Sequence, residues 1–479
     1  MPMQVSDSRS LLTAVVVMLL FASPLSGADR SRPNVLFIAV DDLNTRLGCY
    51  GFEHIRSPNI DALAARGVAF QRAYCQYPSC GPSRASVMTG LRPQSTGVLS
   101  NKVHFRHFIP DAVTLPQVFR KNGYFVARVG KIYHQANPTH IGTSGPDDPA
   151  SWEQVINPRG RDKDEEDLLT VYTPQLPLPD QMCYLKADGN DSEQTDGKVA
   201  DSTIALLKEH RDDDAPFFIA AGFYRPHIPY IAPRQYFDLY DFKRAKLPGL
   251  PGNYRSLVPA AALASTPQWP NFGTTEQQAR ECILAYDACV SFVDAQVGRV
   301  IKALDDLRLS ENTIIVLWGD HGYHLGEHGL WRKNSLYEES ARAPLIIAGP
   351  GVQSERSHCD RIVEFVDIYP TVGDLAGLTV PSELEGRSLR PLLEHAEHKW
   401  DHAAFTETHF RDVSGRSIRT ARWRCVLWGE NGKDGVELYD QMSDPLEMNN
   451  LANDASFRKP LETLRRRIQD HWGKHGDRD

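Results

Sequence analysis

Four largely apolar segments, each followed by titratable side chains, constrain the fold of this 479-residue chain more than any other feature. The segments are 34–40 before Asp41 and Asp42, 124–129 before Lys131 and His134, 217–223 before Arg225 and His227, and 313–318 before Asp320 and His321. Continuous rather than alternating hydrophobicity indicates strands that are covered on both faces, as in a parallel sheet. Helical patterns lie between the segments, so we predict an α/β fold.

Two of the helical patterns have clear limits. A short helix is predicted to open at Thr114 with an early proline and to stop at Gly123. A longer helix is predicted from about 282 to 309, because its apolar residues recur on one helical face. Those residues are Val290, Val293, Val297, Ile301 and Leu304.

The polar residues after the four apolar segments predict one site. Ligands of open α/β sheets bind at the carboxyl ends of the strands. A single Asp-Asp pair after a strand is more often a turn, but four such endings in one chain favour a shared active site at this edge.

Residues 80–90 (CGPSRASVMTG) read as a loop that enters a helix, with Pro82 near the first helical position. The free N–H groups of a helix N-terminus suit a tetrahedral anion, and Arg84 adds a fixed fork of donors one turn later. A buried thiol followed by a capped helix fits these residues equally well.

The residues after the first and last apolar segments form a candidate metal site. Asp41, Asp42, Asp320 and His321 are mostly hard ligands that suit Ca²⁺ or Mg²⁺. A thiolate belongs poorly in such a set, because sulfur prefers softer metals. If Cys80 lies among these residues, either the metal is zinc or the side chain is no longer a thiol.

The pattern C-x-P-S-R-x-x-x-x-T-G that begins at Cys80 is identified as the signature of the type I sulfatases, in which the cysteine is oxidised to Cα-formylglycine. The hydrate of that aldehyde supplies oxygens in place of sulfur. Further blocks resemble the iduronate-2-sulfatase branch of the family, and they lie at 40–43, 47–51, 57–61, 129–134, 225–229, 320–322, 325–329, 437–440 and 444–445. His321 stands where many sulfatases have asparagine, and it favours this branch.

The resemblance implies an alkaline-phosphatase-like sandwich, with a large, mostly parallel central sheet flanked by helices and a smaller C-terminal α+β subdomain with an antiparallel sheet. It also implies one Ca²⁺ ion, held by Asp41, Asp42, Asp320, His321 and modified Cys80. Arg84 and Lys131 would steady the formylglycine and the sulfate, and His134 would polarise the diol or assist its breakdown. His227 and Lys333 would contact the sulfate and the leaving oxygen, with His227 as the better proton donor and Lys333 as its competitor.

The expected activity is hydrolysis of carbohydrate sulfate esters, with the 2-O-sulfate of uronate residues in a glycosaminoglycan-like polysaccharide as the expected substrate. In the implied mechanism a diol oxygen attacks sulfur, and the remaining hydroxyl then expels sulfate and restores the aldehyde. A formylglycine-generating enzyme is the implied maturation partner. Two alternatives are a phosphonate monoester or phosphodiester hydrolase of the same superfamily, and a sulfoglycan-binding protein with unmodified Cys80.

The N-terminus predicts export. Arg9 precedes an apolar run at 11–21, and Ser26 and Ala28 fit a cleavage site. We therefore predict a signal peptide at 1–28, a catalytic domain at 29–390 and a C-terminal subdomain at 391–479. An uncleaved anchor is the alternative, and no later run is long and apolar enough to span a membrane.

The C-terminal subdomain is predicted to contain strands at 403–408, 417–427 and 435–439, followed by a helix with an apolar stripe. The stripe (Leu461, Leu464, Ile468 and Trp472) lies beside 465–467, which are all arginine, so a basic membrane helix is the alternative to a packed surface helix.

Several other functions are disfavoured. The formal net charge of −8 argues against nonspecific nucleic-acid binding. His321, His324, Glu327 and His328 suggest a zinc protease, but nearby glycines predict a loop rather than the required helix. Besides Cys80 there are seven cysteines and no obvious disulfide pair. Two proline-rich stretches, 142–181 and 248–274, are predicted to be long surface loops that wall the substrate cleft.

Overall fold

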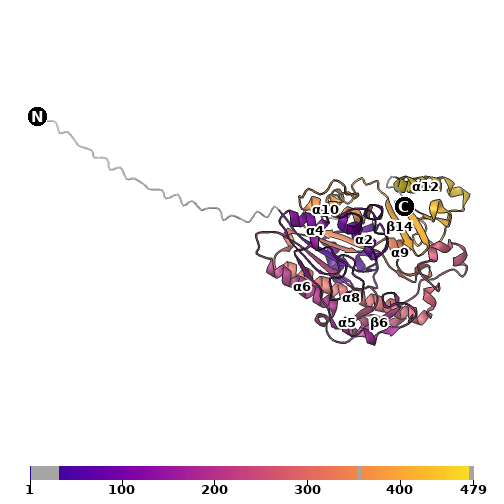
Figure 1. The fold of residues 1–479 in the computed structure, drawn as a ribbon, viewed down its shortest axis with the longest axis horizontal. Coiled ribbons are helices and arrows are strands. Elements are labelled where there is room, and N and C mark those ends of the chain that lie inside the picture. Colours follow the sequence, from indigo (N-terminus) through magenta and orange to yellow (C-terminus); the bar gives the residue numbers. More distant parts are fainter. Residues whose placement is uncertain (2–31, 354–357, 474–479) are drawn as a thin grey trace. The chain divides into compact units, whose positions relative to one another are not determined.

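An eight-stranded sheet forms the centre of the fold in the computed structural model, which describes residue 1, residues 32–353 and residues 358–473 (Figure 1). In spatial order the strands are β13 (His358–Glu364), β2 (Gly67–Tyr74), β12 (Leu345–Ala348), β9 (Thr313–Gly319), β1 (Asn34–Val40), β7 (Phe217–Phe223), β3 (Phe125–Gly130) and β4 (Gln154–Ile156). All neighbours are parallel except those of β12. The predicted α/β class and the mostly parallel sheet are therefore confirmed.

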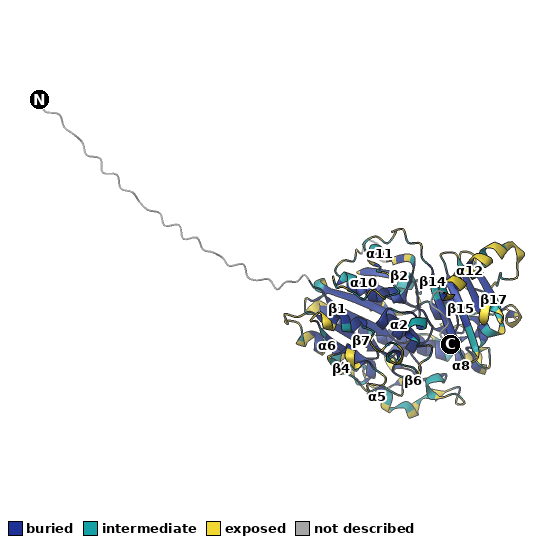
Figure 2. Cartoon of the chain, turned by 45° about the horizontal axis from the view of Figure 1, so that its top comes forward, coloured by how far each residue is buried: buried dark blue, intermediate teal, exposed yellow. Residues whose placement is uncertain are grey.

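Strand β1 lies at the middle of the sheet and shows why the apolar segments are continuous. Its residues are buried along the whole strand (Figure 2). Leu36, Ile38 and Val40 enter the hydrophobic core on one face of the sheet. Val35 and Phe37 enter the core on the other face. Because both faces need apolar side chains, alternation is lost.

Helices cover both faces. The helices α6 (Thr195–Glu209) and α8 (Glu276–Asp306) pack on one face, and α2 (Cys80–Thr89), α4 (Leu115–Lys121) and α10 (Ile368–Leu375) pack on the other (Figure 1). Thr114 caps α4 as predicted, in a capping box with Gln117. Helix α8 begins six residues before the predicted start, because Thr275 and Gln278 form a second capping box.

The C-terminal sheet is antiparallel, in the order β14 (Ala404–Phe410), β15 (Val413–Arg419), β16 (Trp423–Trp428) and β17 (Gly435–Asp440). The predicted single strand at 417–427 is wrong, because this segment is a hairpin in which Ile418 pairs with Cys425. Helix α12 (Arg458–Gly473) covers the sheet and buries Leu464, Ile468 and Trp472. The predicted packed surface helix is thus confirmed.

The two proline-rich stretches are not structureless. The first contains β4, α5 (Arg161–Asp164) and β5 (Thr170–Val171), and β5 joins β6 (Cys183–Ala187) and β8 (Tyr230–Pro233) in a small sheet. The second contains three short 3₁₀ helices, Tyr254–Ser256, Ala260–Leu263 and Asn271–Gly273.

The predicted signal peptide lies outside the described residues. Within the described ranges, no helix combines the length and the apolar character needed to cross a membrane. All eight cysteines lie in the described ranges, and none of them is paired in a disulfide.

A buried carboxylate at the end of β13 joins the two sheets. Glu364 receives two hydrogen bonds from Arg92, at 2.6 and 2.9 Å, and a third from the backbone N–H of Phe405 in β14 at 2.8 Å. Burial raises the pKa of Glu364, but Arg92 and His402 together outweigh burial and hold the pKa well below its ordinary value. This carboxylate therefore stays ionised in the folded protein at pH values where the unfolded chain binds a proton.

Replacing Glu364 with glutamine is expected to lower the free energy of unfolding by about 3–5 kcal/mol at pH 7, because Arg92 loses its buried partner. The stabilisation is complete above the unfolded pKa of about 4.5 and is lost as the pH falls toward the folded value. The difference in the free energy of unfolding between wild type and Glu364→Gln, measured with urea, should therefore shrink below about pH 4.5. Exposed Glu383→Gln is the matched control, and a deficit equal at pH 7 and pH 3.5 would contradict this linkage.

Candidate active site

The carboxyl ends of β1 and β9 bring three of the predicted acids together. Asp41 and Asp42 follow β1, and Asp320 and His321 follow β9, which pairs with β1 in register up to Val40 and Gly319. All four side chains are buried. The backbone N–H of Asp42 donates to Asp320 Oδ1 at 3.0 Å, so the two strand ends are locked to each other.

The backbone at Asp42 is strained. Its φ is 60°, in the left-handed region that residues other than glycine rarely adopt. The hydroxyl of Tyr286, from α8, donates to the Asp42 carbonyl at 2.8 Å and accepts the Asn44 N–H at 2.9 Å. These bonds hold the turn that directs Asp42 into the site.

Cys80 is the first residue of α2, which runs for ten residues, so the helix begins two residues before Pro82. Its Sγ lies 3.4 Å from His321 Nε2, 3.4 Å from Lys333 Nζ and 3.8 Å from Asp42 Oδ1. Burial raises the pKa of the thiol well above its ordinary value. An unmodified Cys80 is therefore a poor thiolate nucleophile.

Three cations balance the three carboxylates. The fully buried Arg84 donates to Asp320 Oδ2 at 2.8 Å and to Asp41 Oδ1 at 3.0 Å. Lys131 Nζ lies 2.5 Å from Asp41 Oδ2 and Lys333 Nζ lies 2.5 Å from Asp42 Oδ1. Arg84, one helical turn after Cys80, thus ties α2 to both strand ends.

The segment that carries Lys333 is held by the C-terminal sheet. Arg424 of β16 donates to the Leu336 carbonyl at 3.0 Å. Tyr337 donates its hydroxyl hydrogen to Glu437 of β17 at 2.9 Å. The position of this lysine therefore depends on both sheets.

Two histidines complete the predicted set. His227 Nδ1 lies 2.5 Å from the Ile228 carbonyl, which only accepts hydrogen bonds, so Nε2 is the nitrogen left for the site; it lies 3.7 Å from Asp42 Oδ2. His134 lines a cavity of about 250 Å³ that also exposes Gly81, the neighbour of Cys80. Its buried Nδ1 has no hydrogen-bond partner among the described residues. Burial lowers the pKa of His134 to about 3, so the ring is neutral.

Four of the five predicted metal ligands form a compact donor set. One donor atom from each of Asp42, Cys80, Asp320 and His321 lies within 4.8 Å of the others. The remaining predicted ligand, Asp41, is engaged with Lys131 and Arg84. Burial raises the pKa of Asp42 above its ordinary value although Lys333 opposes the shift. A carboxylate that is incompletely compensated in this way, beside a second carboxylate and an imidazole, fits a hard divalent cation.

Sequence reasoning missed several residues that shape the site. Asn101 Oδ1 accepts the Gly81 N–H at 2.7 Å, and Asn137 lies 3.5 Å from Asp41 Oδ2 while its own buried Oδ1 lacks a partner in the described chain. Asn101 follows the Cys80 motif in the sequence, and Asn137 follows His134. This proximity along the chain is the only signal that could have indicated the two asparagines.

The zinc-protease alternative is disfavoured by the local structure. His324 lies in the two-residue strand β10 (His324–Leu325) and His328 in a 3₁₀ turn (Glu327–Gly329), so no helix aligns them. His328 instead groups with Glu339 and Glu447, whereas His321 groups with Asp42, Cys80 and Asp320.

An eight-stranded, largely parallel sheet between helical layers, with a charged site at its carboxyl edge and a nucleophile candidate on a helix N-terminus, defines the alkaline-phosphatase-like class of hydrolases. The model of the sulfatase family matches residues 33–378, and that of the C-terminal region of N-sulphoglucosamine sulphohydrolase matches residues 326–474. The chain therefore belongs to the sulfatase family and is a sulfuric ester hydrolase.

Individual relatives agree with this assignment. The chain is 34% identical to a sulfatase of Formosa agariphila, over 91% of this chain and 86% of the relative. It is 31% identical to mouse iduronate 2-sulfatase, over 90% of this chain and 93% of the relative. The predicted resemblance to the iduronate-2-sulfatase branch is confirmed.

Solved structures share the fold. A 2-O GAG sulfatase has a TM-score of 0.72 and 27% identity, over 93% of each chain. A phosphonate monoester hydrolase from Silicibacter pomeroyi has a TM-score of 0.76 and 25% identity, over 93% of this chain and 96% of that chain.

Proposed function

We propose that this sulfatase removes the 2-O-sulfate from uronate residues of a glycosaminoglycan-like polysaccharide. The observation that carries the proposal is the environment of Cys80, which lies at a helix N-terminus against Lys333 and His321. The sugar and the position of the sulfate are supported by relatives named iduronate 2-sulfatase and Δ4,5-hexuronate-2-O-sulfatase, the latter 29% identical over 94% of this chain.

The charges of the site support a monoanionic ester as substrate. Three carboxylates face three cations in the site. A divalent metal would therefore leave two positive charges in excess, enough for the single negative charge of a sulfate ester. A phosphonate monoester or a phosphodiester carries the same charge, and its hydrolysis is the second candidate function because of the similarity to phosphonate monoester hydrolase structures.

We propose that Asp41, Asp42, Asp320, His321 and modified Cys80 hold one Ca²⁺ ion, which would neutralise charge on the sulfate oxygens. Converted to Cα-formylglycine by a formylglycine-generating enzyme, Cys80 would supply an oxygen nucleophile that also suits this metal. Because burial raises the pKa of the Cys80 thiol, an unmodified cysteine would be a poor nucleophile at this position, which is a reason to expect a modified residue.

Arg84 and Lys131 hold Asp41 and Asp320 in their ionised form. Burial alone would raise the pKa of Asp41, but Lys131 and nearby cations keep it well below its ordinary value. The pKa of Asp320 is also lowered, because Arg84, His321 and Lys131 together outweigh the effect of burial. Ionised carboxylates are the form that a metal requires.

His227 is the preferred proton donor to the departing sugar oxygen. In an in-line displacement the leaving oxygen lies opposite the nucleophile. Lys333 lies 3.4 Å from Cys80 Sγ, on the side of the nucleophile, and is placed to contact the sulfate. Burial and Lys333 hold the pKa of His227 well below its ordinary value, so the bound anion is needed to draw a proton onto Nε2. His134 is proposed to act on the nucleophile from the 250 Å³ cavity.

The direct test compares kcat/KM for a 2-O-sulfated uronate disaccharide, an aryl sulfate and an aryl phosphonate monoester. We expect the sulfated disaccharide to be the best of the three substrates. A higher kcat/KM for the phosphonate would favour the second candidate function, and binding of the disaccharide without hydrolysis would favour a sulfoglycan-binding protein.

Removal of the metal is expected to lower kcat/KM for the aryl sulfate by at least about 100-fold, because the charge that stabilises the transition state is lost. Ca²⁺ should restore activity after chelation, and the ion content of the protein should return to one per chain by elemental mass spectrometry. Restoration by Zn²⁺ but not by Ca²⁺ would contradict the hard-ligand assignment.

The cellular setting is also a proposal. We propose a signal peptide at 1–28, a catalytic domain at 29–390 and a C-terminal subdomain at 391–479, with export of the mature protein. Sulfated carbohydrate is its proposed partner, with no nucleic acid and no stable membrane insertion after removal of the signal.

A further inference from the structure

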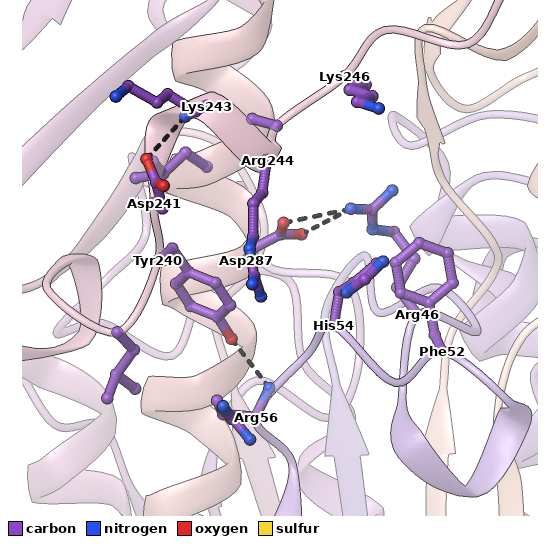
Figure 3. A pocket seen from close by; sticks show the side chains of 13 residues that line it. Arg46, Phe52, His54, Arg56, Tyr240, Asp241, Lys243, Arg244, Lys246 and Asp287 are labelled. Carbon is purple, nitrogen blue, oxygen red and sulfur yellow. Dashed lines mark hydrogen bonds and ion pairs between the residues drawn. The ribbon is translucent and has the colours of Figure 1, made fainter.

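A second cationic pocket, of about 800 Å³, lies between the loop after β1, helix α8 and the segment 239–246 (Figure 3). Figure 3 shows Arg46, Phe52 and His54 on one side, Tyr240, Lys243 and Arg244 on the other, and Asp287 of α8 between them. None of these residues belongs to the site around Cys80.

The charge of the lining is unusual for this protein. Five lysine and arginine residues and two aspartates line the pocket, a formal charge of 5 − 2 = +3, in a chain with a net charge of −8. Asp287 is neutralised by Arg46 at 3.1 Å. No ion pair joins Arg56, Lys243, Arg244 or Lys246 to another described residue. Unpaired cations gathered around a hollow favour an anionic ligand.

The walls of the pocket are held in place without a ligand. The Arg46 guanidinium stacks 4.2 Å from the ring centre of Phe52. Arg280 of α8 donates to the carbonyls of Ala245 and Phe242, at 2.6 and 3.1 Å. The segment that carries the three exposed cations is therefore fixed to the long helix, and little ordering entropy opposes binding.

The pocket is close to the catalytic centre along the chain. Arg46 follows Asp42 by four positions, so their Cα atoms are at most about 14 Å apart. Tyr286, which holds the Asp42 turn, precedes Asp287 of the pocket in α8. One short loop and one helix thus carry residues of both sites.

We propose that this pocket binds a second anionic sugar unit of an oligosaccharide whose sulfate ester lies at Cys80. The proposal rests on the proposed function and deepens it, since it makes an oligosaccharide rather than a single sugar the substrate. Arg and Lys groups recognise sulfate or carboxylate oxygens, and the aromatic residues Phe52 and Tyr240 also line the pocket. The hollow shape favours a saccharide over a flat membrane surface.

The test uses the full mature protein and the double variant Arg244→Ala/Lys246→Ala, in which both changed residues are exposed and unpaired among the described residues. We expect its affinity for a defined sulfated hexasaccharide to fall at least 10-fold by calorimetry. The ratio of kcat/KM for the hexasaccharide to that for an aryl sulfate should fall by a similar factor, with a weaker dependence on salt. The control Lys121→Ala/Lys208→Ala removes the same charge from exposed positions that precede β3 and β7, near the amino ends of the strands. Its hexasaccharide affinity and its kcat/KM ratio should stay within twofold of wild type.

Equal hexasaccharide affinity in the two double variants would overturn the proposal, and so would equally strong displacement of the hexasaccharide by RNA of matched charge. Competition by an unsulfated polyuronate hexasaccharide would assign carboxylate recognition to the pocket, and competition by sulfated chains alone would assign sulfate recognition. If neither the 2-O-sulfated disaccharide nor the 2-O-sulfated hexasaccharide is hydrolysed but hexasaccharide binding still depends on Arg244 and Lys246, the proposed substrate fails while the pocket stands.

Discussion

Cys80→Ala is expected to lower kcat for every sulfate ester by at least about 10⁴-fold, because no other group replaces a lost nucleophile. The side chain is small and buried, so the variant should fold and its melting temperature should remain close to that of wild type. Steady-state hydrolysis of an aryl sulfate, alongside thermal unfolding of the same preparation, measures both effects.

Cys80→Ser tests the release of sulfate separately from the attack on sulfur. A serine hydroxyl can attack sulfur once, but its sulfate ester then needs water to leave. We therefore expect at most one equivalent of released alcohol per chain, with the mass of one SO3 group added to the protein, because the ester oxygen is that of the serine. Sustained turnover by this variant, or a free thiol at Cys80 in fully active wild-type protein, would contradict the formylglycine proposal.

Arg84→Ala is expected to lower the free energy of unfolding by about 3–5 kcal/mol, because it leaves Asp41 and Asp320 buried with less compensation. Arg84 also donates to the Lys131 and Ile132 carbonyls, at 2.8 and 2.9 Å. Urea unfolding at pH 7 measures the loss.

A surface pair provides the control for this change. Arg66 pairs with Asp305, and both side chains are at least 40% exposed. Its replacement by alanine should therefore cost less than about 1 kcal/mol. Should Arg84→Ala not fold, Arg84→Lys keeps the charge and is expected to fall between wild type and the loss predicted for alanine. Equal losses for Arg84→Ala and Arg66→Ala would show that the buried pairs add nothing to stability.

The central strands could be predicted from the sequence because both of their faces are buried. Strands β1, β7 and β9 are almost unbroken apolar runs, and β3 is interrupted only by Arg128, so local sequence reveals all four. Strand β2 was missed because Gln71 and Arg72 interrupt its apolar pattern. The antiparallel β12 has only four residues, and the hairpin of β15 and β16 lacks a Gly- or Asn-rich turn that would have divided it.

The members of the candidate active site were predictable, but their pairings were not. Strand ends and the motif at Cys80 indicated which residues meet at the sheet edge. The engagement of Asp41 by Lys131 and Arg84 depends on side-chain geometry that no spacing encodes. The second cationic pocket escaped prediction because Arg46 and Arg244 are almost 200 positions apart and neither belongs to a recognised motif.

Arg424 and Glu437 contact the segment after Lys333. A truncated chain without the C-terminal sheet would lose these contacts. A chain that ended before β14 would retain all ten residues expected to bind metal or perform chemistry. It would lack the scaffold that fixes one of them. The smallest active form of this enzyme therefore includes the C-terminal sheet as well as the expected catalytic residues. A gene fragment that encodes every motif up to Lys333 but not this sheet is not expected to encode an active sulfatase.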